Sequence, residues 1–319
     1  DHRDLHSFPT RRSSDLRICW LAGNRLQAPN GAPSAPPGSD PPWVRALLIG
    51  SGLTILGLVL FLPLAVVFVE AFAKGVGTYW QALRDPDTLA AIRLTLQVAA
   101  SAVAANTLFG LAAAWCLSRA PFPGRRFLEG LIDLPFTVSP VIAGLVFVLL
   151  FGRQGWLGPW LAERGWQVIF APPGIVVATL FVTLPIVAKE LIPLMRGQGT
   201  DEEEAALVLG ASGWQIFWRI TLPRIRRALL YGVILCNARA MGEFGAVSVV
   251  SGHIRGKTNT VPLHVEMLYN EYDFTGAFAV ASLLTLLALG TLVLKALLDW
   301  REGGAGTAPG DEGGTEGEH

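Results

Sequence analysis

Residues 199–227 read GTDEEEAALVLGASGWQIFWRITLPRIRR and lie between two apolar stretches of the chain. Thr200 and Glu203 have the spacing of a helix-capping box, and residues 201–204 are all acidic, which favours the first turn of a helix. Gly210 can end this helix, because glycine readily adopts the left-handed conformation that often follows the last helical turn.

A second helix is expected soon after this glycine. Ser212 and Gln215 form another capping-box pattern. The Leu222-Pro223 pair is expected to end the second helix, since proline lacks an N–H group and clashes with the preceding turn. The stretch therefore predicts a helix, a bend and a helix.

The composition indicates a membrane protein with several spans. Of the 319 residues, 51% are hydrophobic and 16% are charged, and the mean hydropathy is +0.45. The formal net charge is zero, so no nucleic-acid partner is indicated. The three cysteines are far apart in the sequence and indicate neither a disulfide framework nor a metal site.

Six stretches are long and apolar enough for the roughly 20 residues that a bilayer core of about 30 Å requires. They are residues 46–72, 89–117, 131–151, 174–194, 228–250 and 277–298. The third and fourth contain prolines, which membrane helices tolerate when neighbours satisfy the backbone. The sequence therefore predicts an all-α transmembrane domain of six helices over residues 46–301, with residues 199–227 as one of its loops.

The two ends of the chain are expected to lie outside this domain. Residues 1–16 resemble a translated sequencing adapter and are excluded from the fold. Residues 17–45 are predicted to be a disordered cytoplasmic lead-in, rich in proline, glycine, alanine and serine from residue 27 on. Residues 302–319 are predicted to be a disordered acidic tail.

Arginine and lysine predict the orientation, because cytoplasmic loops carry an excess of positive charge. The predicted loops after the second and fourth spans are the richest in arginine, and their residues are Arg119, Arg125, Arg126, Arg196, Arg219, Arg224, Arg226 and Arg227. Both termini and residues 199–227 are therefore expected on the cytoplasmic side.

The loop also carries a family signature with the spacing E-A-A-x3-G-x9-I-x-L-P. Its defined positions are Glu204, Ala205, Ala206, Gly210, Ile220, Leu222 and Pro223. This pattern resembles the coupling loop of the membrane subunits of bacterial ABC importers. Small alanines would permit close approach of another surface, and the chain has no room for a nucleotide-binding fold once the spans are removed.

Two further segments resemble one branch of that family. Residues 237–246 read NARAMGEFGA and residues 249–256 read VVSGHIRG, which is similar to sulfate/thiosulfate permeases of the CysW type and to the related molybdate permeases. The resemblance covers about residues 46–301 and implies a type I ABC importer membrane domain in the bacterial inner membrane.

That resemblance also implies the partners. They are a second related permease subunit, two ATPase subunits that bind ATP and magnesium, and an external sulfate-binding protein. The chain itself is then a transporter subunit without a cofactor and not an enzyme.

Five polar residues of the third and fifth predicted spans are candidates for lining or gating the pathway: Asn237, Arg239, Glu243, Asp133 and Ser139. Arg239 and Glu243 are four residues apart and share one helix face, so they either attract and gate an oxyanion or form a structural ion pair. Asp133 is either a partner of Arg239 or an interfacial residue. Ser139 either contacts the anion or repairs the backbone at a proline break.

Two other functions remain open at this point. Molybdate and tungstate are tetrahedral dianions like sulfate, so an importer for them is the closest alternative. A channel or secondary anion transporter would need no ATPase and would leave the signature in residues 199–227 unexplained.

The orientation is testable with reporter fusions. A reporter fused after residue 301 is expected to behave as cytoplasmic and one inserted near residue 260 as external, because of the distribution of arginine. Measured activities with the opposite pattern would overturn the orientation.

Overall fold

The computed structural model describes residues 41–303. The interpretations of residues 1–16, of most of residues 17–45 and of nearly all of residues 302–319 lie outside this range. The chain falls into two compact units, one up to Val59 and one from Leu60 on. The first contributes the N-terminal part of helix α2 (Pro42–Ala71), and the second contains the elements described below.

Every regular element within residues 41–303 is a helix. In this part of the chain, four helices are long and apolar enough to cross a membrane, and they are α2, α4 (Pro86–Arg119), α8 (Pro172–Gly197) and α14 (Phe274–Gly303). Shorter helices connect them, namely α3 (Val76–Arg84), α7 (Gly158–Glu163), α9 (Asp201–Val208) and α13 (Val261–Asn270). The remaining two predicted spans are bent pairs of helices, so the predicted six spans are present only if each pair counts as one.

The first bent pair corrects the prediction for the third span. Helices α5 (Arg125–Thr137) and α6 (Pro140–Phe151) meet at 104° instead of forming one helix with tolerated prolines. Pro140 begins α6, and Ser139 before it is extended, with φ −57° and ψ 131°. A residue before proline is pushed out of the helical region, which explains the break. By contrast, α8 does continue through its internal prolines, as predicted.

The second bent pair divides the fifth predicted span. Helix α11 (Leu222–Met241) and helix α12 (Gly245–Ser251) lie on either side of residues 242–244. The helical stretch Gly213–Met241, which includes α11, is bent by 51° relative to α12. Helix α12 packs against α6, so the later parts of the two bent pairs lie together. A side chain at Gly144 of α6 would meet the carbonyl oxygen of Ala246 at 2.8 Å, and one at Gly245 would meet Pro140 at 3.0 Å. Glycine at both positions therefore permits this close contact.

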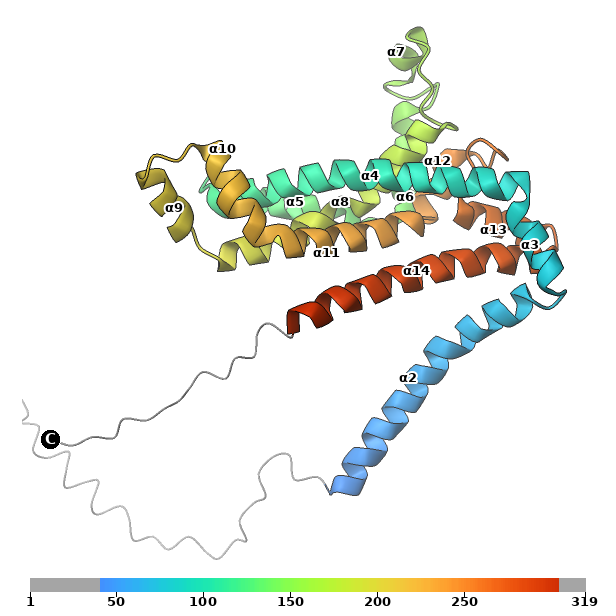
Figure 1. Cartoon of the computed structure of the whole chain (residues 1–319). Helices are drawn as coiled ribbons and strands as arrows, with labels where there is room; N and C mark the ends of the chain where they lie inside the picture. The colour runs from blue at the N-terminus through green and yellow to red at the C-terminus, as the bar shows by residue number, and fades with distance from the viewer. Residues whose placement is uncertain (1–40, 304–319) are drawn as a thin grey trace, which may run out of the picture. The chain divides into compact units, whose positions relative to one another are not determined.

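Helices α4, α8 and α11 pack against one another and form the centre of the bundle (Figure 1). Fully buried Asn106 of α4 donates to the Leu180 carbonyl (3.2 Å) and to the Thr183 hydroxyl (2.7 Å) of α8. One turn further along α4, a Cβ atom added to Gly110 would lie 2.7 Å from Cβ of Val187. A small residue and a buried amide thus hold two membrane helices close together.

The contact at Gly110 is testable by adding one methyl group. Gly110→Ala is expected to destabilise the bundle by about 1–3 kcal/mol, because neither Val187 nor the α8 backbone can move freely. The measurement is the thermal midpoint and yield of the detergent-extracted protein. Gly290→Ala in α14, where nothing lies within 4 Å of the added atom, is the matched control. Equal behaviour of the two variants would contradict this packing.

Candidate functional site

The signature loop folds as the predicted helix, bend and helix. Helix α9 is followed by Gly210, whose φ of +86° is left-handed, and then by α10 (Gly213–Ile216). Ser212 and Gln215 form both hydrogen bonds of the predicted capping box. Figure 1 shows α9 and α10 together beyond one end of α4 and α11.

The predicted end of the second helix at Leu222-Pro223 is wrong. A π-helical segment, η1 (Phe217–Thr221), follows α10 and leads directly into α11. The N–H group of Leu222 bonds to the carbonyl of Phe217, five residues back. Pro223 lies in the first turn of α11, directly after the π-helical segment, and the chain stays helical through it.

The capping box predicted for Thr200 and Glu203 is also wrong. The Thr200 hydroxyl bonds to the carboxylate of Glu204 at 2.6 Å. The side chain of Glu203 turns away from the N-terminus of α9, because its Oε1 accepts hydrogen bonds from Arg119 (3.0 Å) and Thr221 (2.8 Å). The acid therefore connects elements distant in sequence and does not cap its own helix.

Arg119, at the last residue of α4, is the centre of this network. Its Nη1 donates to the carbonyls of Met195 (3.0 Å) and Gly199 (2.6 Å), and its Nη2 donates to Glu203. These carbonyls lie at and just beyond the C-terminal end of α8, where helical carbonyls lack intrahelical partners. The sequence showed that this region is rich in arginine. It did not show which groups Arg119 binds, because those groups are many residues away along the chain.

The loop exposes an apolar face made of five large side chains, beside exposed acidic residues in the first turn of α9. The five are Leu207, Val208 (87%), Leu209 (88%), Trp214 and Trp218. Among the signature residues, Glu204, Ala205, Gly210 and Pro223 are exposed, whereas Ala206, Ile220 and Leu222 are half-buried. An apolar patch of this kind on a connecting loop is typical of a protein-docking surface.

Two of the three candidates of the fifth span, Arg239 and Glu243, form an ion pair, which was one of the two predicted alternatives. Arg239 Nη1 lies 2.6 Å from Glu243 Oε2, with the arginine side chain 43% exposed and the glutamate side chain 1% exposed. Glu243 Oε1 also accepts the N–H group of Ala246 in the first turn of α12 (3.1 Å). Asn237 is half-buried, and its amide contacts Met241.

The two candidates of the third span lie in different surroundings. Asp133 pairs with Lys189 of α8 at 3.0 Å, so the predicted alternative partner Arg239 is not the one observed. Lys189 thus bridges α5 and α8. Ser139 is exposed at the break between α5 and α6, and its side chain does not cap α6.

The structure brings the two breaks together. Ser139 directly precedes Pro140, and Glu243 lies two residues before Gly245, which is the residue in close contact with Pro140. Asp133 belongs to the contact between α5 and α8. The candidates therefore divide into a group at the paired breaks and a separate interhelical ion pair.

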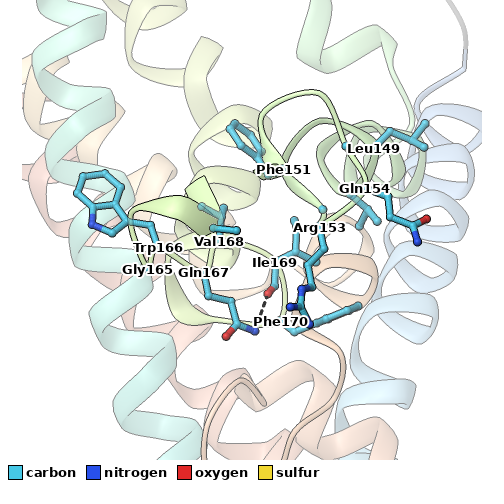
Figure 2. Close-up of a pocket in the computed structure, with 15 residues that line it drawn as sticks. Leu149, Phe151, Arg153, Gln154, Gly165, Trp166, Gln167, Val168, Ile169 and Phe170 are labelled. Carbon is cyan, nitrogen blue, oxygen red and sulfur yellow. Dashed lines mark hydrogen bonds between the residues drawn. The ribbon is translucent and has the colours of Figure 1, made fainter. Parts of the chain in front are cut away.

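A cavity of about 760 Å³ lies elsewhere, between the end of α6 and the start of α8 (Figure 2). It is lined by residues of the connecting segment, including Arg153, Gln154, Trp166 and Phe170, and the Gln167 amide donates to the Ile169 carbonyl. No sequence-predicted site residue lines it. Among the described residues no cluster of His, Cys, Asp or Glu could hold a metal ion.

Known proteins resemble both the sequence and the fold. Residues 106–302 match the family described as binding-protein-dependent transport system inner membrane component. The sulfate transport system permease protein CysW of Escherichia coli strain K12 is 53% identical over 81% of this chain and 89% of its own. That of Synechocystis sp. strain PCC 6803 is 55% identical over 82% and 94%.

A solved structure of a bacterial alginate ABC transporter has a chain with the same fold. The TM-score is 0.67 at 16% identity, covering 80% of this chain and 92% of the other. Together with the family match, this confirms the predicted all-α importer fold. The chain therefore belongs to the family of binding-protein-dependent transport system inner membrane components.

Proposed function

We propose that this chain is the membrane-spanning subunit of an ATP-driven importer for sulfate or thiosulfate. The observation that carries the proposal is the identity of 53–55% to proteins named sulfate transport system permease over about nine tenths of their length. The apolar outward face of the signature loop agrees with the dependence on a separate ATPase. The chain then contributes part of the pathway and performs no hydrolysis of its own.

The proposed partners follow from the same loop and from a second group of relatives. Val208 and Leu209 would lie against an ATPase subunit on the cytoplasmic side, and that subunit would bind ATP and magnesium. The permease protein CysT of Escherichia coli is 38% identical to this chain, which supports pairing with a related second permease. An external binding protein would deliver the anion.

The paired breaks are the proposed place where the anion passes. Discontinuous membrane helices often form transport sites, because their freed backbone groups and polar side chains face a cavity. The charge of Glu243 is offset by Arg239 and by the N–H group of Ala246. The side chain of Arg239 is 43% exposed, so its guanidinium can also donate hydrogen bonds to an oxyanion while it remains paired with Glu243.

Uptake of labelled sulfate by cells lacking the gene, with and without the plasmid-borne gene, tests the proposed function. The expected result is uptake that depends on the gene and on ATP and is reduced by unlabelled thiosulfate. Competition by molybdate but not by thiosulfate would favour molybdate over sulfate or thiosulfate as the substrate. Uptake that persists without ATP would instead favour a channel or secondary transporter.

The bend at Gly210 provides a test of coupling. Gly210→Val forces a β-branched residue into a left-handed conformation, which costs about 1–2 kcal/mol or more. We expect this variant to insert into the membrane, but to co-purify with little ATPase and to support little uptake of sulfate.

Gly213→Val is its matched control, because that glycine also has open space around it but lies at the start of α10 without a left-handed φ. Normal co-purification and uptake with Gly210→Val would show that the loop is not a coupling element.

The ion pair of span five is tested by single and double substitutions. Arg239→Met alone leaves the buried Glu243 carboxylate without its arginine, which costs roughly 3–5 kcal/mol and should lower the amount of protein. Arg239→Met combined with Glu243→Gln should restore the amount, measured by immunoblot, but not sulfate uptake. Arg153→Met, at an exposed arginine of the cavity segment, is the control. Normal uptake by the double variant would make the pair purely structural.

A further inference from the structure

Helix α9 is held to the bundle in an unusual way. None of its residues Asp201–Val208 is buried, so packing contributes little to its position. Its acidic first turn nevertheless reaches two other elements through Glu203, whose side chain is only 13% exposed. Polar contacts therefore decide where α9 lies.

The contacts of Glu203 connect three helices of the bundle. Arg119 at the end of α4 donates to Glu203 and also to two carbonyls at the end of α8. Thr221, which is 2% exposed and directly precedes α11, donates to the same carboxylate oxygen. Hydrogen bonds with an ionised partner are about twice as strong as neutral ones.

The neighbouring acid makes a different kind of contact. Glu202 pairs with Arg224 at 3.1 Å, but its side chain is 62% exposed. Exposed ion pairs contribute little, because water and salt screen them. The two adjacent acids of α9 thus differ in burial and in the number of elements they join.

We propose that Glu203 is a positioning residue that transmits movement of the α9–α10 loop to α4, α8 and α11, through Arg119 and Thr221. The inference rests on the proposed function, since the movement is that imposed by the ATPase. Without Glu203 the loop would still present its apolar face to the ATPase. Its displacement would then reach the helices that pack around Asn106 and Gly110 only through the η1 join and the exposed Glu202–Arg224 pair.

The π-helical segment explains why Thr221 is a suitable end of this connection. Residues Phe217–Thr221 form the join between α10 and α11, and π-helical turns are a less stable geometry that often marks functional positions. A join of this kind can deform when α10 moves. The bond from Thr221 to Glu203 bypasses it and ties α9 directly to the start of α11.

The test uses the complete transporter reconstituted in vesicles, with its ATPase, second permease and binding protein. Three quantities are measured: the amount of assembled complex, the rate of ATP hydrolysis and the uptake of labelled anion. The variants are Glu203→Ala, Glu203→Gln and Thr221→Val, with Glu202→Ala as the matched control. A positioning role changes uptake per ATP hydrolysed, whereas a purely structural role changes only the amount of complex.

We expect Glu203→Ala to assemble and hydrolyse ATP while uptake per ATP falls roughly tenfold, because the hydrogen bonds from Arg119 and Thr221 are both lost. Glu203→Gln, which keeps a neutral acceptor oxygen, should recover part of the loss, and Glu202→Ala should match the wild type. Unchanged uptake per ATP hydrolysed in Glu203→Ala, or an equal fall of this quantity in Glu202→Ala, would overturn the inference.

Two arrangements keep the result decisive. If Glu203→Ala does not assemble, uptake per ATP is measured with Glu203→Gln, and an unchanged value there overturns the inference.

Uptake of labelled sulfate and of labelled molybdate is measured in parallel with the wild-type complex. Uptake of molybdate alone would overturn the proposed substrate and would still leave the ratio measurable.

Discussion

The arrangement of the bundle depends on the close contact between α6 and α12. Lipid cannot satisfy a broken backbone, so a break within a span is tolerated only where protein or water covers it. Gly144 and Gly245 allow the two helices that follow the breaks to touch, and each break is thereby placed beside the other. This single contact brings Ser139 and the Arg239–Glu243 pair to one region of the molecule.

The same helices extend from this region to the signature loop. Helix α11 begins directly after η1 and ends just before the second break, while α4 and α8 end at the carbonyls and side chains that Arg119 joins. A displacement of the loop is therefore applied to rigid helices whose other parts lie near the paired breaks. Movement of the loop by a separate ATPase could thus act on the pathway through these helices, with the Glu203 contacts bridging the deformable join η1.

Periodicity and residue type were sufficient to predict the all-helical fold, the positions of the apolar stretches and the bend at Gly210, because these depend on local preferences. They were insufficient wherever a distant partner decided the outcome. Glu203 binds Arg119 and does not cap its own helix as predicted, and Asp133 pairs with Lys189. The two prolines also behave differently: Pro140 begins a new helix after a break, whereas α8 runs through Pro185 without one.

Binding of a separate ATPase to the apolar face of the signature loop can be measured with a photo-crosslinking residue at Val208. In membranes of cells that produce the whole transporter, we expect this residue to form a crosslink to the ATP-binding subunit. The same residue at Leu108, which is equally apolar and 72% exposed but lies within α4, should give no such product. A crosslink to the ATPase from Leu108, or none from Val208, would contradict the account.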